Sequence, residues 1–284
     1  MKTKLIDYVD NGPIFITGHV NPDGDALGSA FALKLFLDTQ NIISDVDFDI
    51  TTKLPSNLNH LPYHLISDDL KEKYNTVFVF DCGNSSRLGK YEEVVLAAEN
   101  IVVIDHHVDP SFGDVQIIDP HAASTTQVLF RQFKDENIEI NEEMANCLLT
   151  GLITDTGRFQ YSNTTSEVFS IAAELLGNGA NLSKISENIY GSIEFNALTL
   201  QSKIIERIVL NEDLQFAHSI VFQNDYKDYK VEPEETDFLI DVVRLVKEST
   251  VALLIKEQED GSFKGSLRSR GDIDVQKIAS IFGG

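Results

Sequence analysis

The sequence predicts an α/β fold in which a doubly wound parallel sheet forms the N-terminal domain and a smaller α+β domain follows. Apolar runs alternate with helical patterns over residues 1–190, as in a sheet with helical crossovers. The runs at 14–17, 77–80 and 101–104 are almost continuously apolar, which is typical of strands buried on both faces. After residue 208 the pattern changes, and this change predicts the second domain.

Helices are predicted between and after these strands. The first covers 26–37, where apolar residues recur at helical spacing and Asp23 or Asp25 can cap the N-terminus. Further helices are predicted over 92–98, 124–134, 142–149, 166–176 and 182–189. The segment 195–208 has few helix breakers, and we interpret it as a connecting helix.

The C-terminal part is expected to mix strands and helices. Strands are predicted at 214–222, 251–256 and 263–268, with a helix running into a strand over 236–246 and a final helix over 274–281. The expected division is a catalytic domain over 1–190, a connecting helix over 191–208 and a substrate-binding domain over 209–284.

Charge limits the possible partners. The chain has 284 residues, of which 42% are hydrophobic, so it can form two domains with cores of their own. Lysine and arginine number 23 against 45 aspartate and glutamate, which gives a net charge of −22. A surface of this charge repels nucleic acid overall, and we expect no duplex DNA partner.

Membrane and disulfide features are absent from the sequence. No run approaches the ~18 apolar residues of a membrane span, and the first residues carry no apolar signal segment. The two cysteines, Cys82 and Cys147, form neither a disulfide framework nor a thiolate zinc site. We therefore expect no membrane partner and a cytoplasmic location.

Acidic and imidazole side chains follow the apolar runs. The set comprises His19, Asp23, Asp25, Asp81, Asp105, His106, His107 and Asp155. Because ligands bind at the carboxyl ends of parallel strands, these side chains are expected to meet at one edge of the sheet. Carboxylates with some imidazole suit two divalent ions and favour Mn²⁺ or Mg²⁺. Two such ions can catalyse reactions at a phosphoryl centre.

Each of these motifs has a simpler explanation when it is taken alone. Asp23 and Asp25 can cap a helix, Asp81 can cap a loop, and Asp155 can be a polar residue at a helix C-terminus. The adjacent histidines are harder to explain, because they have little packing value at a buried strand end. All the simpler explanations would have to hold at once, so the sequence favours a metal cluster.

The same motifs resemble those of the DHH phosphoesterase superfamily. The matching segments are GHVNPDGDALG at 18–28, Asp81, DHH at 105–107 and TDTG at 154–157. The segment GSLRSR at 265–270, followed by VQKIA at 275–279, resembles the DHH-associated domain of the oligoribonuclease/pAp-phosphatase (NrnA-type) branch. This resemblance covers nearly the whole chain.

The resemblance implies a ligand set for two ions, most simply two Mn²⁺. One ion would take His19, Asp23 and Asp81, and the other would take Asp25, Asp81, His106 and Asp155. Asp81 would therefore bridge the ions. His107 would face the scissile phosphate as a hydrogen-bond or proton donor, and Asp105 would orient the neighbouring histidines.

The resemblance also places substrate contacts in the second domain. Arg268 would bind a substrate phosphate, with Ser266 and Arg270 as further candidates. We expect the active site in the cleft between the domains, because Arg268 must reach a phosphate held on the ions. The family continues past Gly283-Gly284 with more glycine and a histidine, so the chain is expected to be truncated within that motif.

The function implied is a two-metal-ion phosphoesterase. It would hydrolyse short oligoribonucleotides, adenosine 3′,5′-bisphosphate (pAp) or both, by attack of metal-activated hydroxide on phosphorus. The alternatives are a manganese-dependent inorganic pyrophosphatase and a non-catalytic nucleotide-binding sensor. The oligomeric state stays open, a homodimer included.

Overall fold

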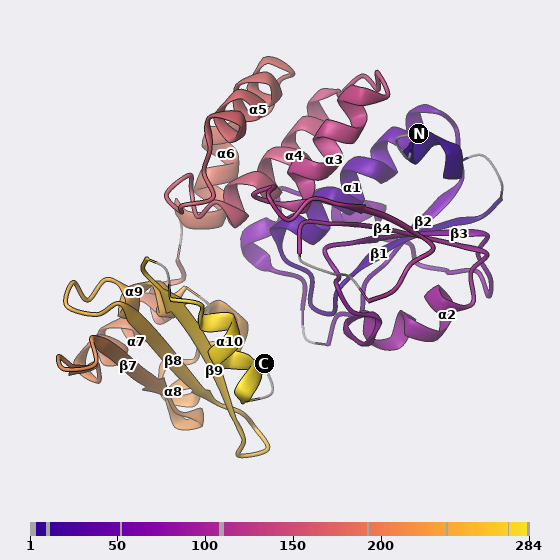
Figure 1. Cartoon of the computed structure of the whole chain (residues 1–284). Coiled ribbons are helices and arrows are strands. Elements are labelled where there is room, and N and C mark those ends of the chain that lie inside the picture. Colours follow the sequence, from indigo (N-terminus) through magenta and orange to yellow (C-terminus); the bar gives the residue numbers. More distant parts are fainter. Residues whose placement is uncertain are drawn as a thin grey trace. The chain divides into compact units, whose positions relative to one another are not determined.

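The computed structural model describes residues 4–9, 12–51, 53–107, 111–191, 193–236, 238–271 and 273–282. The chain forms two compact units, Met1–Gly191 (unit 1) and Ser192–Gly284 (unit 2), and each is described by itself (Figure 1). Gly283 and Gly284, where the truncated motif is expected, lie outside the described residues. No helix in the described part of the chain is long and apolar enough to span a bilayer.

Unit 1 is built on a five-stranded parallel sheet, as predicted. Its strands are β1 (Ile14–Gly18), β2 (Ser44–Val46), β3 (Thr76–Phe80), β4 (Asn100–Asp105) and β5 (Val115–Ile118). They lie in the order β2-β1-β3-β4-β5, and every neighbouring pair is parallel. The predicted runs are β1, β3 and β4. The edge strands β2 and β5 were not predicted, because they are short and lack a continuous apolar pattern.

Helices cover both faces of this sheet. They are α1 (Gly24–Thr39), α2 (Glu92–Leu96), α3 (Thr125–Asp135), α4 (Glu142–Asp155), α5 (Ser166–Gly177) and α6 (Leu182–Ser186). Short 3₁₀ turns lie at Leu5–Tyr8, Ser56–Leu58, Tyr63–Leu65 and Ser85–Tyr91, and a π turn lies at Glu187–Gly191. Helices α1, α3 and α4 lie on one side of the sheet and α2 lies on the other (Figure 1).

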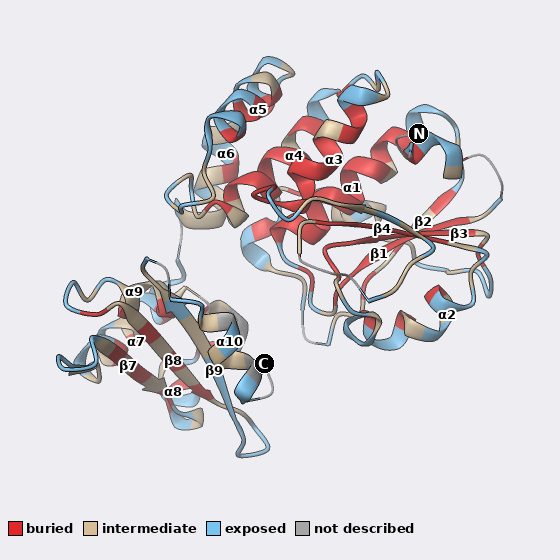
Figure 2. Cartoon of the chain, viewed as in Figure 1, coloured by how far each residue is buried: buried red, intermediate tan, exposed pale blue. Residues whose placement is uncertain are grey.

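Alternation along β3 shows why the strand is apolar throughout. Phe78 and Phe80 join the core on the side of α1, α3 and α4, whereas Val77 and Val79 join a second core with Val95 of α2. Figure 2 shows the central strands and α1 as buried. A strand that is buried on both faces has no polar side to alternate with, which is why the sequence pattern identified it.

Helix α4 is longer than predicted and carries the fourth acidic motif. The helix predicted over 142–149 continues to Asp155, its last residue. Asn141 caps its N-terminus by accepting a hydrogen bond from the backbone N–H of Met144. Helix α4 packs tightly on α1 at Gly28, where a Cβ atom would lie 2.4 Å from the carbonyl oxygen of Cys147.

Unit 2 is a smaller α+β fold, as predicted. Its strands are β6 (Val209–Asn211), β7 (Phe216–Val221), β8 (Val251–Glu257) and β9 (Phe263–Ser269), in that order. Only β7 and β8 are parallel. Its helices are α7 (Phe195–Glu206), α8 (Gln223–Tyr229), α9 (Leu239–Arg244) and α10 (Val275–Ile281), with a 3₁₀ turn at Pro233–Thr236.

Two expectations for this part of the chain are refined. Helix α7, which we interpreted as a connector, buries Ala197, Leu200 and Ile204 in the core of unit 2. The pattern over 236–246 forms α9 without running into a strand, and β8 begins only at Val251.

Substitution of Gly28 tests the contact between α1 and α4. Overpacking costs about 1–3 kcal/mol, and a clash with backbone falls at the upper end because backbone does not move aside easily. Alanine gains ~1 kcal/mol over glycine within a helix. We therefore expect Gly28→Ala to lower the free energy of unfolding by about 2 kcal/mol in chemical denaturation.

Gly177→Ala is the matched control, because nothing lies within 4 Å of the added Cβ atom at this helical position. We expect Gly177→Ala to be neutral or stabilising by up to ~1 kcal/mol. Equal stability of the two variants would contradict close packing at Gly28.

Candidate metal centre

The acidic and imidazole side chains of unit 1 gather where the strand order reverses between β1 and β3. In sheets of this kind, ligands bind outside the carboxyl ends of the strands at such a reversal. Asp81 follows β3 directly, and its backbone φ of 54° is unusual for a residue other than glycine. Its N–H donates to the carbonyl oxygen of Ile104 on β4. The side chain is thereby held at the centre of the edge.

Three imidazoles surround the buried Asp81 carboxylate. Its oxygens lie 3.5 Å from His19 Nε2, 3.7 Å from His106 Nε2 and 3.3 Å from His107 Nδ1. Two ligand atoms at about 2.1 Å from one ion are about 3 to 3.5 Å apart. The separations around Asp81 are close to that range, so this arrangement suits ions between the side chains.

All eight residues singled out in the sequence come together here. Ligand atoms lie within 4.8 Å of one another in each of three groups, which are His19, Asp23 and Asp81; Asp25, His106 and Asp155; and Asp81, Asp105, His106 and His107. The first group is one of the two ion sets that the resemblance implies, and the second group holds three of the four residues of the other set, without Asp81. Asp81 contacts members of both sets.

Both candidate imidazole ligands present the same ring nitrogen to the acids. His19 Nδ1 lies 2.9 Å from the carbonyl oxygen of Val20, and His106 Nδ1 lies 3.4 Å from that of Ala122. A ring that donates from Nδ1 to a carbonyl keeps the lone pair of Nε2 free for a metal. This donor set of two imidazoles and four carboxylates fits divalent ions with hard or borderline preferences.

Asp25 is held at the N-terminus of α3, a contact that the sequence did not predict. Its carboxylate accepts hydrogen bonds from the backbone N–H groups of Thr125 at 2.6 Å and Thr126 at 2.9 Å. The Thr125 hydroxyl donates to Asp81 at 3.2 Å. Gly151 has no side chain and so leaves space for the Asp25 carboxylate, since a Cβ atom at this position would lie 2.6 Å from Asp25 Oδ1. The only sequence signal was the run of hydroxyl residues at 124–126.

Asp105 organises the two histidines that follow it. Its Oδ1 accepts from the backbone N–H of His106 at 2.7 Å and of His107 at 3.0 Å, and it lies 2.7 Å from His107 Nδ1. His107 therefore has Nε2 left for a substrate, and its side chain is 43% exposed, compared with 18% for His106. The geometry suits Asp105 as an orienting group and His107 as the ring that faces the substrate.

Burial disfavours the charged form of the carboxylates at this edge. Burial, with the charges of Asp81 and Asp23, raises the pKa of the Asp25 carboxyl to about 8. Burial and the charge of Asp25 also raise the pKa of Asp155 well above its usual range. Burial acts in the same direction on the pKa of Asp81, but hydrogen bonds from His107 and His19 outweigh it and lower that pKa.

The histidines carry the compensating charge. Burial acts to lower the pKa of His19, yet the carboxylates of Asp23 and Asp81 raise it to about 10. Hydrogen bonds to Asp105 and Asp81 raise the pKa of His107 to about 10. In the described part of the chain, histidines are the only basic side chains paired with the acids of this site. Protons therefore occupy positions that metal ions can take.

The three substrate candidates lie on and just after β9 in unit 2. Arg268 is exposed, and its guanidinium donates to the neighbouring carbonyl of Leu267 at 3.0 Å. Ser266 is half-buried on the same strand. Arg270 donates to the carbonyl oxygens of Arg244 and Val246 at the end of α9, a contact typical of a helix C-cap. A substrate role remains a prediction for all three residues.

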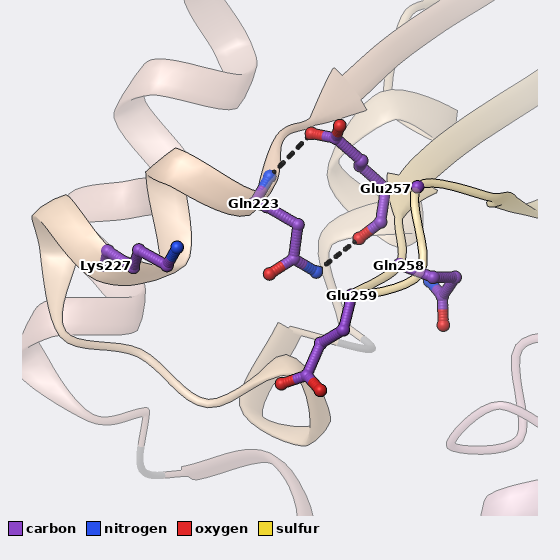
Figure 3. Close-up of a pocket in the computed structure, with 6 residues that line it drawn as sticks. Gln223, Lys227, Glu257, Gln258 and Glu259 are labelled. Carbon is purple, nitrogen blue, oxygen red and sulfur yellow. Dashed lines mark hydrogen bonds between the residues drawn. The ribbon is translucent and has the colours of Figure 1, made fainter.

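A separate hollow of about 340 Å³ lies on unit 2 (Figure 3). Gln223 closes one side by donating to both the side chain and the backbone carbonyl of Glu257. Lys227 and Glu259 also line it. None of the three candidate metal groups in the described residues includes a residue of this hollow, so the chemistry points to the edge of the sheet in unit 1.

Metal binding should release protons. Asp25 and His19 favour their protonated forms near pH 7 in the metal-free protein, since their pKa values are raised to about 8 and about 10. An ion must displace these protons, so affinity should rise as pH rises from 6 to 8. Calorimetry in buffers of different ionisation enthalpy should show release of about two protons at pH 7. Affinity that does not change with pH would contradict these ligands.

Comparison with known proteins gives one consistent family. The family model described as "DHH family, N-terminal domain" matches residues 13–152. The bifunctional oligoribonuclease and PAP phosphatase NrnA of Thermus thermophilus is 32% identical over 282 residues, covering 96% of this chain and 81% of that protein. The protein of the same name from Bacillus subtilis is 26% identical over 291 residues, covering 100% of this chain and 90% of that protein.

A solved structure matches almost the whole fold. The crystal structure of an exopolyphosphatase-related protein from Bacteroides fragilis has a TM-score of 0.90 and 25% sequence identity, and the match covers 98% of this chain and 85% of that chain. The predicted resemblance is confirmed by these likenesses and by the family model. The chain belongs to the DHH family, in the branch that contains the NrnA proteins.

Proposed function

We propose that this chain is a metal-dependent phosphoesterase that hydrolyses short oligoribonucleotides and pAp with two divalent ions, Mn²⁺ first. The observation that carries this proposal is the position of Asp81, whose carboxylate reaches His19 of one ligand group and His106 of the other. When bound, the two ions supply a water of lowered pKa and offset the charge that develops on the phosphoryl oxygens. The names of the relatives support the substrate class.

His19, Asp23 and Asp81 would hold one ion, and Asp25, Asp81, His106 and Asp155 would hold the other. Mn²⁺ binds both carboxylate and imidazole donors readily. Mg²⁺ prefers oxygen donors and binds imidazole nitrogen less well. A chain with a net charge of −22 also needs local positive charge before it can take up an anionic substrate. The ions would supply that charge.

His107 would act on the phosphate that is cleaved. The Asp105 carboxylate lies 2.7 Å from Nδ1 of this ring, and this contact raises the pKa of His107, which favours the protonated ring. A protonated ring can hydrogen-bond a phosphoryl oxygen through Nε2–H or pass that proton to the leaving oxygen. Arg268 would bind a second phosphate that is not cleaved, since its exposed guanidinium can make two parallel hydrogen bonds.

A panel of substrates tests the proposal directly. Purified protein with Mn²⁺ is assayed on pAp, the dinucleotide pApA, short RNA and pyrophosphate. Release of adenosine monophosphate from pAp and pApA, with slow pyrophosphate hydrolysis, is the expected result. Pyrophosphate as the best substrate would favour the pyrophosphatase alternative, and nucleotide binding without turnover would favour a sensor.

Substitution of Asp81 tests the bridging role. Asparagine is the suitable replacement, because it tolerates the positive φ as well as aspartate does while it removes the charge. Asp81→Asn should weaken the binding of both ions. It should also lower kcat/KM about a thousandfold or more, since the two ions together supply several kcal/mol of stabilisation in the transition state. Asp25→Asn should chiefly weaken the binding of one ion, the one that it would hold together with His106 and Asp155. Calorimetry that finds two ions at wild-type affinity in Asp81→Asn would contradict the assignment.

Kinetics should distinguish the role of His107 from that of Arg268. His107→Ala should still bind both ions but show a lower kcat, because the ring holds no ion in this arrangement.

Arg268→Ala should raise KM for nucleotides and barely affect hydrolysis of a small chromogenic phosphodiester that lacks a second phosphate. Lys264→Ala, two positions before Ser266 on the same strand, is the matched control and should leave the hydrolysis of both substrates unaffected. Equal losses on both substrates in Arg268→Ala would contradict the second-phosphate role.

A further inference from the structure

A short segment of unit 1 contacts two members of the Asp25, His106 and Asp155 group. In the segment 122–126, the carbonyl oxygen of Ala122 lies 3.4 Å from His106 Nδ1. The backbone N–H groups of Thr125 and Thr126 donate to the Asp25 carboxylate at 2.6 and 2.9 Å. Both side chains are therefore placed by backbone atoms of one segment just before and within the first turn of α3.

Asn163 links the third member, Asp155, to this same segment. The Nδ2 atom of Asn163 lies 3.0 Å from the backbone carbonyl oxygen of Asp155 and 3.2 Å from that of Ala123. Asp155 ends α4, where helix carbonyls lack partners within the helix. One side-chain amide therefore joins the end of α4 to the segment that leads into α3.

The chain bends sharply to bring Asn163 to this position. Gly157, Arg158 and Phe159 have φ values of 53°, 63° and 62°, in the left-handed region. Arg158 and Phe159 occupy this region at a cost, because their side chains disfavour it. The bend turns the chain back toward the end of α4, so that the amide of Asn163 reaches two carbonyls from separate parts of the chain.

The amide orientation follows from its partners. Both contacts are to carbonyl oxygens, which only accept, so the NH₂ group must face them. Asn163 Oδ1 is buried and has no hydrogen-bond partner among the described residues. The side chain therefore serves the two carbonyls, and its oxygen contributes no bond that would explain its placement.

We propose that Asn163 is a positioning residue for one of the two ions, the one assigned to Asp25, His106 and Asp155. This inference rests on the proposed two-ion site. Without the amide, the end of α4 loses its tie to the segment 122–126, and Asp155 moves independently of the other two ligands. In the described part of the chain, the hydrogen bonds of Asn163 go to Ala123 and Asp155 and to no member of the His19, Asp23 and Asp81 group, which should keep its ion.

Titration of Mn²⁺ into wild-type protein and Asn163→Ala, followed by calorimetry, tests this role. Loss of a hydrogen bond that orients a metal ligand typically weakens metal binding about 10–100-fold. We expect a loss of that size for one ion in Asn163→Ala and less than about a twofold change for the other. Excess Mn²⁺ should restore kcat, and thermal melting should show that the metal-free variant is still folded.

Asn188→Ala is the matched control. Its Nδ2 also donates to a helix carbonyl, that of Lys184 at 2.7 Å, and no hydrogen bond among the described residues joins it to the segment 122–126. We expect two ions at wild-type affinity in this variant. If Asn163→Ala fails to fold, Asn163→Ser, which keeps a shorter donor, is measured in its place.

Two results would overturn the inference. If Asn163→Ala binds both ions with wild-type affinity, the amide does not position a ligand. If the affinity for both ions falls equally, the role of the amide is a general structural one. Wild-type protein that binds fewer than two ions would contradict the proposed function itself. The wild-type titration therefore distinguishes the two failures.

Discussion

Repulsion between buried carboxylates is the constraint on which the rest of the site depends. Asp25 and Asp105 are fully buried, and Asp81 is nearly so, within one edge of the sheet in unit 1. Buried carboxylates are costly unless cations or hydrogen bonds compensate them. Here three histidines and several backbone N–H groups compensate in part, and burial together with the charges of Asp81 and Asp23 still raises the pKa of Asp25. Divalent ions bound between these carboxylates would offset their negative charge.

The fold meets this constraint with backbone atoms as much as with side chains. The N-terminus of α3 points two N–H groups at Asp25, where the helix dipole also favours a negative charge. Gly151 and Gly28 let α4 approach closely, since a Cβ atom at either position would clash. The tight packing of α1 and α4 thus brings Asp25 and Asp155, which lie on different helices, to one place.

The proposed function assigns different roles to the two units. Unit 1 holds the acids and imidazoles, whereas unit 2 contributes the arginines of and beside β9. Arg270 is engaged with the end of α9, which leaves Arg268 as the better candidate for a substrate phosphate. Under the proposed function, specificity for nucleotides over small polyanions would depend on unit 2, and hydrolysis itself on unit 1.

The sequence by itself determined the parallel sheet, the family and the identity of the acids and imidazoles at its edge. Strands buried on both faces leave a continuous apolar run, and ligand residues follow such runs directly. Tertiary structure alone decided the rest: the short edge strands, the full length of α4, the packing of α7 in unit 2, and the contacts of Thr125, Thr126 and Asn163. Those contacts use backbone N–H and carbonyl groups, which every residue carries, so no residue type in the sequence marks where they meet.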